Sequence, residues 1–406
     1  MIVDAADMTN RPTDAACPLR IALVSPYDLA VAGGVNNHIA QLAAHFRAGG
    51  HYVRIIGPSS GPPVVGTSED IIVIGRPVPV PTSGSIARIA LSPRLSPRVK
   101  EVLAVERFEV VHVHEPLMPF LPITFLRHSE AVNVGTFHAA KDGGNRLYAY
   151  SKRLLKRWFR KLDGKIAVSP AAERLVSRYF PGYYNIIPNG IDLARFTGVT
   201  PRPELCDGKL NILFVGRMEK RKGLKYLLRA YIAVKREMPN TRLIVVGEGR
   251  LREGYERSMR RAAVPDVVFT GYVPADDLPR YYASAHICCF PATGNESQGY
   301  VLLEAMASGK PVVASNIEGF ASVITDGVEG HLVEPKNAEA LALALVHLLA
   351  DRALREQMSH HARLRAEAYG WDRVARRVLS YYQRLLFERG LTQQSRLRRL
   401  AATHSA

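Results

Sequence analysis

The chain has 406 residues, of which 47% are hydrophobic and 22% charged. This length and balance exclude a disulfide-stapled mini-protein and a disordered or fibrous chain, and they predict two domains of roughly 200 residues each. The 54 basic and 37 acidic side chains leave a formal net charge of +17. Such a charge favours a polyanionic partner, which could equally be nucleic acid, an anionic membrane surface or a phosphorylated substrate.

The cysteines and the hydropathy indicate where the protein works. The four cysteines show no C-x-x-C spacing, which fits a reducing cytoplasm. No apolar run approaches the roughly 18 residues that cross a bilayer, and residues 1–20 are polar rather than signal-like. We therefore expect a cytoplasmic protein whose membrane contact, if it has one, is peripheral.

Short β-branched runs alternate with helical stretches along the whole chain, which is the pattern of βαβ units and parallel sheets. The first half predicts strands at 20–25, 52–56, 71–74, 110–114, 132–136, 165–168 and 185–187. The second half repeats the pattern at 210–215, 242–246, 267–270, 286–290, 311–314 and 330–333. The sequence therefore predicts an α/β protein with two doubly wound domains.

The domain boundaries are predicted from composition. Residues 197–208 hold two prolines and two glycines within a segment of little periodicity, so we place the linker there. From the N-terminus, the predicted parts are a disordered extension (1–18), a first domain (19–196), the linker (197–208), a second domain (209–370), a helix (371–392) and a flexible basic tail (393–406).

In the first domain, two candidate ligand contacts directly follow predicted strands, where parallel sheets bind ligands. Gly33 and Gly34 precede a helix, so the backbone and the first helical amides could approach an anion closely, although such a pair is more often a plain turn. His138 follows the fifth strand, where a neutral imidazole could contact a sugar hydroxyl. Alone, it is more often an ordinary structural histidine.

In the second domain, Arg217 and Lys222 bracket the loop after the first strand. Two cations there could stabilise a departing diphosphate in place of a metal ion, and the alternative is a solvated basic turn. Glu296 and Glu304 are separated by seven residues that include Gly299. This spacing predicts a helix whose N-terminal amides face a ligand, with a carboxylate at either end to bind hydroxyl groups.

Taken in order, these segments resemble the retaining GT-B glycosyltransferases of family 4, over about residues 19–387. The segments are 33–35, 136–138, 188–192, 216–223 and 296–304. Within the family, residues 79–88, 112–116 and 135–139 are most similar to the bacterial phosphatidylinositol mannosyltransferases. The resemblance implies two Rossmann-like domains facing a central cleft, with a C-terminal helix that crosses back to the first domain.

The resemblance also implies a reaction and its donor. A hexose, with mannose favoured, would pass with retention from a nucleotide-diphosphate sugar, GDP-mannose or a UDP-hexose, to a phosphatidylinositol-like membrane lipid. No cofactor or metal is expected, since the sequence contains no D-x-D pair and the diphosphate itself could take the acceptor proton. By resemblance, Arg217 and Lys222 bind the diphosphate, Glu304 binds the ribose, and Val273 contacts the base. The transferred sugar is bound by Glu296 together with Gly299, Tyr300 and Val301. From the first domain, His138 contacts this sugar, and Gly33 and Gly34 lie beneath it.

The acceptor side departs from its nearest relatives. Tyr27 and Arg88 match acceptor contacts, and we place Asn36 beside them, but Thr82 and Ser83 stand where that subfamily has Tyr-Asn. The loop at 139–146 also lacks the Ser/Thr-rich character of the subfamily. These changes weaken the case for inositol, and a soluble sugar, sugar phosphate or polysaccharide is the alternative acceptor. A nucleic-acid-binding protein is not expected, because no RNP-like, zinc or helix-turn-helix pattern occurs.

Residues 151–165 combine seven basic side chains and one acid with apolar residues at helical spacing. This pattern suits docking on anionic lipid at the inner face of the cell membrane. The alternative is a domain helix that buries its apolar stripe in the core. The predicted membrane contacts are Lys152, Arg153, Lys156, Arg157, Trp158, Arg160 and Lys161.

Overall fold

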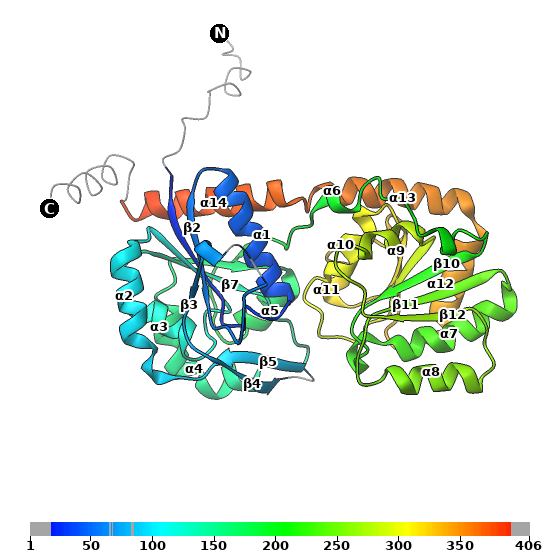
Figure 1. Cartoon of the computed structure of the whole chain (residues 1–406), viewed down its shortest axis with the longest axis horizontal. Helices are drawn as coiled ribbons and strands as arrows, with labels where there is room; N and C mark the ends of the chain where they lie inside the picture. The colour runs from blue at the N-terminus through cyan, green and yellow to red at the C-terminus, as the bar shows by residue number, and fades with distance from the viewer. Residues whose placement is uncertain (1–17, 65, 67, 83–84, 391–406) are drawn as a thin grey trace, which may run out of the picture.

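The computed structural model describes residues 18–64, 66, 68–82 and 85–390. Two α/β domains lie side by side, each built on its own parallel sheet (Figure 1). This confirms the predicted fold class. The predicted extension at 1–18, apart from Pro18, and the predicted tail at 393–406 lie outside the described residues.

The N-terminal domain has a seven-stranded parallel sheet in the order β3-β2-β1-β6-β7-β8-β9. Its strands are β1 (Arg20–Val24), β2 (Tyr52–Gly57), β3 (Ile71–Val73), β6 (Val110–His114), β7 (Val132–Phe137), β8 (Gly164–Ala167) and β9 (Asn185–Ile186). Its helices are α1 (Gly34–Ala48), α2 (Ser96–Glu106), α3 (Leu121–His128), α4 (Arg146–Phe159) and α5 (Pro170–Ser177). The strand order reverses between β1 and β6, so the loops after these two strands open the crevice where such sheets bind ligands.

The C-terminal domain repeats this plan with six strands in the order β12-β11-β10-β13-β14-β15. They are β10 (Leu210–Val215), β11 (Thr241–Val246), β12 (Val267–Gly271), β13 (Ile287–Phe290), β14 (Val312–Ser315) and β15 (Gly330–Val333). The helices are α6 (Leu193–Phe196), α7 (Leu224–Glu237), α8 (Arg252–Arg261), α9 (Leu278–Ser284), α10 (Tyr300–Ala307), α11 (Glu318–Ala321), α12 (Ala338–Ala350) and α13 (Arg352–Glu367). Short 3₁₀ turns occupy Ser68–Asp70, Pro93–Leu95, Pro203–Leu205 and Lys220–Lys222.

An antiparallel hairpin, β4 (Pro77–Thr82) and β5 (Ser85–Ala90), was not predicted from the sequence. Three prolines in β4 obscure it, because proline cannot donate to a β-ladder. They alternate along the strand, and Pro79 pairs with Arg88, whose carbonyl points outward and accepts from the Asp28 N–H at 2.9 Å. The prolines therefore share the outward-facing positions of β4, where no ladder bond is lost.

The C-terminal helix α14 (Trp371–Glu388) crosses back onto the first domain, as the resemblance implied. It packs on α1, β7 and β8 and runs along the top of the N-terminal domain in Figure 1. Trp371, Val378 and Tyr382 are buried in the same core cluster as Ile21 and Ile55. The last helix is thus part of the N-terminal core.

The linker predicted at residues 197–208 lies elsewhere. Ile187 belongs to the N-terminal core and Ile191 to the C-terminal core, so the chain passes between the domains at residues 187–191. Leu205, inside the predicted linker, is buried in the C-terminal domain. Proline and glycine mark irregular backbone, but they do not reveal which core the neighbouring apolar side chains join. The first crossing lies beside the return, since Ile191 N–H bonds the Tyr369 carbonyl and Trp371 N–H the Ile191 carbonyl.

Candidate active site

The loop after β1 is shaped by one buried carboxylate. Asp28 is 1% exposed; its Oδ1 accepts from the N–H groups of Ala30 and Ser60, and its Oδ2 accepts from the Ser60 hydroxyl at 2.7 Å. Arg88, from β5, lies 3.8 Å from Asp28 Oδ2. The carboxylate thereby joins the loop to the hairpin and orients Arg88.

Asn36, predicted to contact an acceptor, lies at the cavity between the domains and also braces its loop. Its side chain is buried. The amide nitrogen donates to the carbonyl oxygens of Asp28 and Val31 at 2.8 and 3.1 Å, and the amide oxygen accepts from the Ser25 hydroxyl at 2.8 Å. Because these bonds use its donors and its oxygen, the Asn36 side chain braces the loop.

His138 lies at the carboxyl end of β7 beside other histidines. Its Nε2 is 2.9 Å from Nδ1 of His114, from the end of β6, and its ring packs edge-on against His38 of α1. Burial lowers the pKa of His138 well below its usual value. The imidazole is therefore neutral at physiological pH, as a residue that hydrogen-bonds a sugar hydroxyl requires.

Glu115 fixes the backbone of this histidine. One of its carboxylate oxygens accepts from the N–H groups of His138 and Ala139 at 2.8 and 2.9 Å. Glu115 has a φ of 48°, an unusual conformation for a residue with a side chain. Burial raises its pKa to about 7. The buried carboxyl group of Glu115, on a residue with an unusual backbone conformation, thus holds the turn that presents His138.

Across the cleft, Glu296 is held by two cations. Arg221 Nη1 and Lys222 Nζ lie 2.5 and 2.7 Å from Glu296 Oε1. Arg217, on the preceding loop, pairs with Glu219 at 3.1 Å and keeps 59% of its side chain exposed. The loop after β10 therefore concentrates positive charge next to one carboxylate, an arrangement suited to a diphosphate beside a hydroxylated group.

Glu296 lies in the loop before α10, whereas Glu304 lies within the helix and not at its far end. Gly299 caps the helix with a φ of 86°, and a Cβ there would meet the Phe320 ring at 2.6 Å, so glycine is required. The second glutamate, Glu304, is partly buried, accepts from the Tyr282 hydroxyl at 2.7 Å and has its pKa raised to about 7 by desolvation. Val273, the predicted base contact, is partly buried in the loop after β12.

The two halves of the site meet at a cavity of about 430 Å³. Tyr27, Gly33 and Arg88 line it from the first domain, and Arg217 from the second. The Tyr300 hydroxyl, at the start of α10, lies 3.5 Å from the Gly34 carbonyl. The structure thus brings predicted donor and acceptor residues to one cavity between the domains. Ser83 lies outside the described residues, and only the backbone of Thr82 is described.

A buried hydrogen-bond chain connects the two sides through the domain crossing. Gln298 Oε1 accepts from both the backbone N–H and the side-chain amide of Asn189, at 2.8 and 3.0 Å. The Asn189 side-chain oxygen is 3.0 Å from His38 Nδ1. The glutamate-containing loop and the histidine cluster are therefore linked by a single asparagine on the crossing segment.

Several residues that shape the site were missed by sequence reasoning. Arg221 and Tyr282 bind the two glutamates, and Glu115 and Asn189 hold the histidine side. Arg221 carried a detectable signal, as a third cation in the same short loop. The contacts of the others join segments far apart in the chain, which a single sequence does not reveal.

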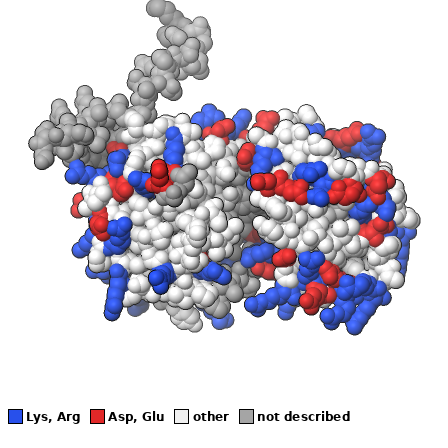
Figure 2. Space-filling view, viewed as in Figure 1, with Lys and Arg blue, Asp and Glu red and all other residues white. Residues whose placement is uncertain are grey.

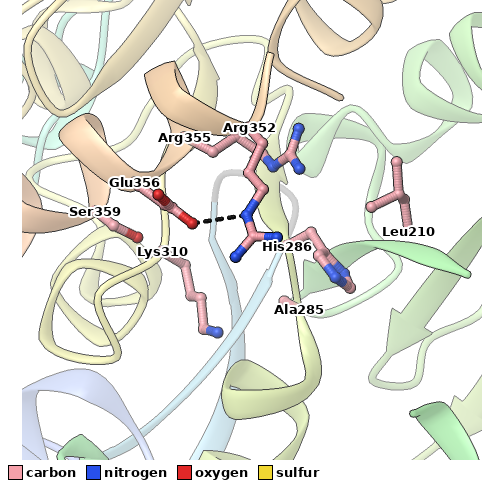
Figure 3. Close-up of a pocket in the computed structure, with 8 residues that line it drawn as sticks. All are labelled: Leu210, Ala285, His286, Lys310, Arg352, Arg355, Glu356 and Ser359. Carbon is pink, nitrogen blue, oxygen red and sulfur yellow. Dashed lines mark hydrogen bonds and ion pairs between the residues drawn. The ribbon is translucent and has the colours of Figure 1, made fainter. Parts of the chain in front are cut away.

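A second cavity, of about 420 Å³, lies at the opposite edge of the C-terminal sheet (Figure 3). His286, which precedes β13, and Lys310, which precedes β14, line it together with Arg352 of α13, whose guanidinium binds Glu356 at 2.8 Å. These strands begin there, whereas parallel sheets bind their ligands where strands end. The interdomain cavity is therefore the candidate active site.

Helix α4 shows features of both interpretations of the basic segment, membrane docking and packing in the domain core. Trp158, predicted to contact a membrane, is 9% exposed and packs in the core with Leu155 and Phe159, so that prediction is wrong for Trp158. The helix nevertheless exposes Leu147, Tyr150 and Leu154 at helical spacing. The six predicted cations of this segment are all exposed: Lys152, Arg153, Lys156, Arg157, Arg160 and Lys161.

Charge elsewhere is mixed. On the face shown in Figure 2, Lys and Arg spread over both domains and alternate with Asp and Glu. Among the described helices, none is long and apolar enough to cross a membrane.

Comparison with known proteins identifies the family. Residues 32–195 match the family described as "Glycosyltransferase Family 4", and residues 209–351 match "Glycosyl transferases group 1". The chain is 37% identical over 370 residues to the phosphatidyl-myo-inositol mannosyltransferase of Mycobacterium leprae, covering 90% of this chain and 96% of that one. The chain belongs to the family 4 glycosyltransferases. The phosphatidyl-myo-inositol mannosyltransferase of Propionibacterium freudenreichii is 32% identical, with 90% and 94% covered.

Solved structures share the fold of this family 4 glycosyltransferase. A glycosyltransferase from Rickettsia africae superposes with a TM-score of 0.73 at 20% identity, covering 91% of this chain and 99% of that one. Anabaena Alr3699/HepE in complex with UDP-glucose gives 0.70 at 17% identity, covering 90% and 99%. At these identities the likeness establishes the GT-B architecture.

Proposed function

We propose that this glycosyltransferase moves a hexose, with mannose favoured, from a nucleotide-diphosphate sugar to a phosphatidylinositol-like lipid, with retention of configuration. The similarity to phosphatidyl-myo-inositol mannosyltransferases over nearly their whole length supports the lipid acceptor and the mannose. The observation that carries the donor assignment is Glu296, bound by Arg221 and Lys222 at the entry to α10.

In the proposed reaction, Arg217 and Lys222 neutralise the diphosphate as its bond to the sugar breaks, so departure needs no metal ion. The leaving phosphate oxygen accepts the proton of the attacking acceptor hydroxyl on the same face of the sugar. Glu296 and the first amides of α10, at Tyr300 and Val301, bind the transferred sugar. Glu304 binds the ribose, and neutral His138 contacts the sugar from the first domain.

Donor binding and transfer test this proposal. GDP-mannose, UDP-glucose and UDP-N-acetylglucosamine are titrated by calorimetry, and the donor that binds is assayed for transfer to phosphatidylinositol and to soluble sugars. Replacing Arg217 and Lys222 together by alanine should lower turnover by about 10²–10³-fold, because charge stabilisation of the leaving group is lost. Arg257→Ala, an exposed change on α8, serves as the matched control.

Three results contradict the proposal: no nucleotide sugar binds, the Arg217 and Lys222 double variant retains full turnover, or transfer requires Mg²⁺ or Mn²⁺. Undiminished transfer in excess EDTA is the expected outcome. Transfer to a soluble sugar in preference to phosphatidylinositol would reject the lipid acceptor alone.

We further propose that α4 docks the N-terminal domain on anionic lipid. Leu147, Tyr150 and Leu154 supply an exposed apolar stripe, and the neighbouring cations each contribute about 1 kcal/mol near an anionic surface. Reversing Lys152 and Arg153 to glutamate should reduce sedimentation with phosphatidylglycerol vesicles, and salt should reduce it further. Arg257→Glu with Arg261→Glu, the same charge change on α8, is the control; equal losses in both variants, or equal binding to neutral vesicles, would reject docking through α4.

A further inference from the structure

Three histidines from separate elements converge beside the proposed transfer site. His38 comes from the first turns of α1, His114 from the end of β6, and His138 from the residue after β7. One ring nitrogen from each lies within 4.8 Å of those of the other two. Zinc binds imidazole nitrogen at about 2.0–2.1 Å, which places neighbouring nitrogens about 3.3 Å apart in a tetrahedral site. Side-chain rotations that close the gaps by about 1.5 Å at most would form such a site.

His38 already has the hydrogen bonding of a metal ligand. Because the Asn189 amide nitrogen donates to Gln298, the Asn189 oxygen faces His38 Nδ1 and accepts its proton. This fixes the tautomer of His38, which carries its proton on Nδ1 and a lone pair on Nε2. Metal-binding histidines characteristically donate their second N–H to a carbonyl or carboxylate in this way.

His114 supplies an independent observation. Its Nδ1 shares one proton with His138 Nε2 across 2.9 Å. Either imidazole can move its proton to its other nitrogen, so a cation can take the place of the shared proton.

We propose that His38, His114 and His138 form a site for Zn²⁺ or a similar borderline transition-metal ion, and that the bound ion inhibits transfer. Three histidines leave one coordination position open for water. An ion bound to His138 would fix the imidazole to the metal and compete with its proposed contact to the transferred sugar. The inhibition rests on the proposed function, whereas the binding of metal does not. Inhibition by zinc is compatible with transfer that needs no metal, and EDTA would then preserve or raise the activity of protein that carries zinc.

Metal binding is tested on the full chain after removal of metals. We expect Zn²⁺ to bind one site per chain by calorimetry, and Co²⁺ to give the intense visible band of four-coordinate nitrogen ligation, which Zn²⁺ abolishes. His38→Gln and His138→Gln should each weaken Zn²⁺ binding at least 10-fold. His360→Gln with His361→Gln, which alters another histidine pair on α13, should leave it unchanged, and unfolding curves confirm that each variant folds.

The outcomes separate the two parts of the inference. Absence of Zn²⁺ binding, or binding that survives both His38→Gln and His138→Gln, overturns the metal site whatever the enzyme's substrate. Binding without loss of transfer overturns the inhibition. If no donor is turned over at all, the proposed function fails, while the Co²⁺ spectrum still decides whether the site exists.

Discussion

Glu115, which is buried, and Glu304, which is partly buried, are carboxyl groups whose pKa desolvation raises to about 7. In the unfolded chain each has a pKa near 4.5, so the folded state binds these protons more tightly. Stability contributed at acid pH is therefore lost as the pH rises from about 4.5 through 7. The loss reaches about 3 kcal/mol per group, because each pKa unit corresponds to about 1.4 kcal/mol.

Glu115→Gln tests this linkage. Glutamine keeps one oxygen to accept from the His138 turn and cannot ionise, so we expect the variant to be more stable than the parent at pH 8 and close to it at pH 5. Denaturant unfolding at the two pH values measures the difference. A stability gap that does not grow with pH would show that Glu115 does not titrate in this range. Glu253→Gln, an exposed change on α8, is the control.

At the scale of single residues, the sequence predicted which residues belong to the site better than it predicted their contacts. Lys222, Glu296, Glu304 and His138 were named from residues and resemblance, and of these the structure pairs Lys222 directly with Glu296. The contacts that position these side chains, such as the ion pair of Arg221 with Glu296, form between residues that only the fold brings together. Asn36, which was named as a ligand contact, also holds its own loop through three buried hydrogen bonds that the sequence did not reveal.

The elements most completely predicted were the parallel strands. They are covered on both faces, so they appear as continuous apolar runs that periodicity detects. The hairpin β4–β5 was missed because its stability comes from pairing and from the contact of β5 with the Asp28 loop. The basic helix α4 was found, but its charge pattern alone did not show that Trp158 faces the core.

The crossing segment carries a prediction of its own. Asn189→Ala removes the side-chain bonds to Gln298 and His38, keeps the backbone bond to Gln298, and leaves the buried His38 Nδ1 unpaired, which costs about 1–3 kcal/mol. We expect kcat to fall by at least 10-fold, with a smaller change in KM, because the two sides of the site lose their alignment. Kinetics of the variant, compared with Asn337→Ala, check this.

Asn337 is a suitable control because it caps α12 away from the cleft and its loss lowers stability by about 1 kcal/mol. If both variants lose the same fraction of kcat, the bridge has no role beyond stability.

At the scale of the whole molecule, α14 makes the two domains interdependent. Trp371 lies against Gly190, where an added Cβ would come within 2.5 Å of the indole, and edge-on to His38. Composition predicted that a helix would occupy the C-terminus, yet it placed the linker wrongly. The two crossings, at 187–191 and 369–371, are defined by the cores that they join.

Trp371→Ala should therefore destabilise the N-terminal domain by about 3–5 kcal/mol, the usual cost of removing a buried aromatic side chain. The remaining tryptophan, Trp158, lies in that domain and reports its unfolding by fluorescence. Phe387→Ala on the same helix is the control, because Phe387 is 73% exposed and should change stability little. Equal effects of the two substitutions would show that α14 does not belong to the N-terminal core.

The alternating prolines of β4 have a further consequence for crowding. A two-stranded ribbon offers two rims on which another chain could add a strand. One edge of this ribbon, that of β5, is covered by the Asp28 loop. The other edge, that of β4, carries proline nitrogens, which have no N–H to donate to an added strand. Copies of the enzyme would thus resist pairing with one another along this ribbon, and the mouth of the cavity beside it would stay accessible to substrate.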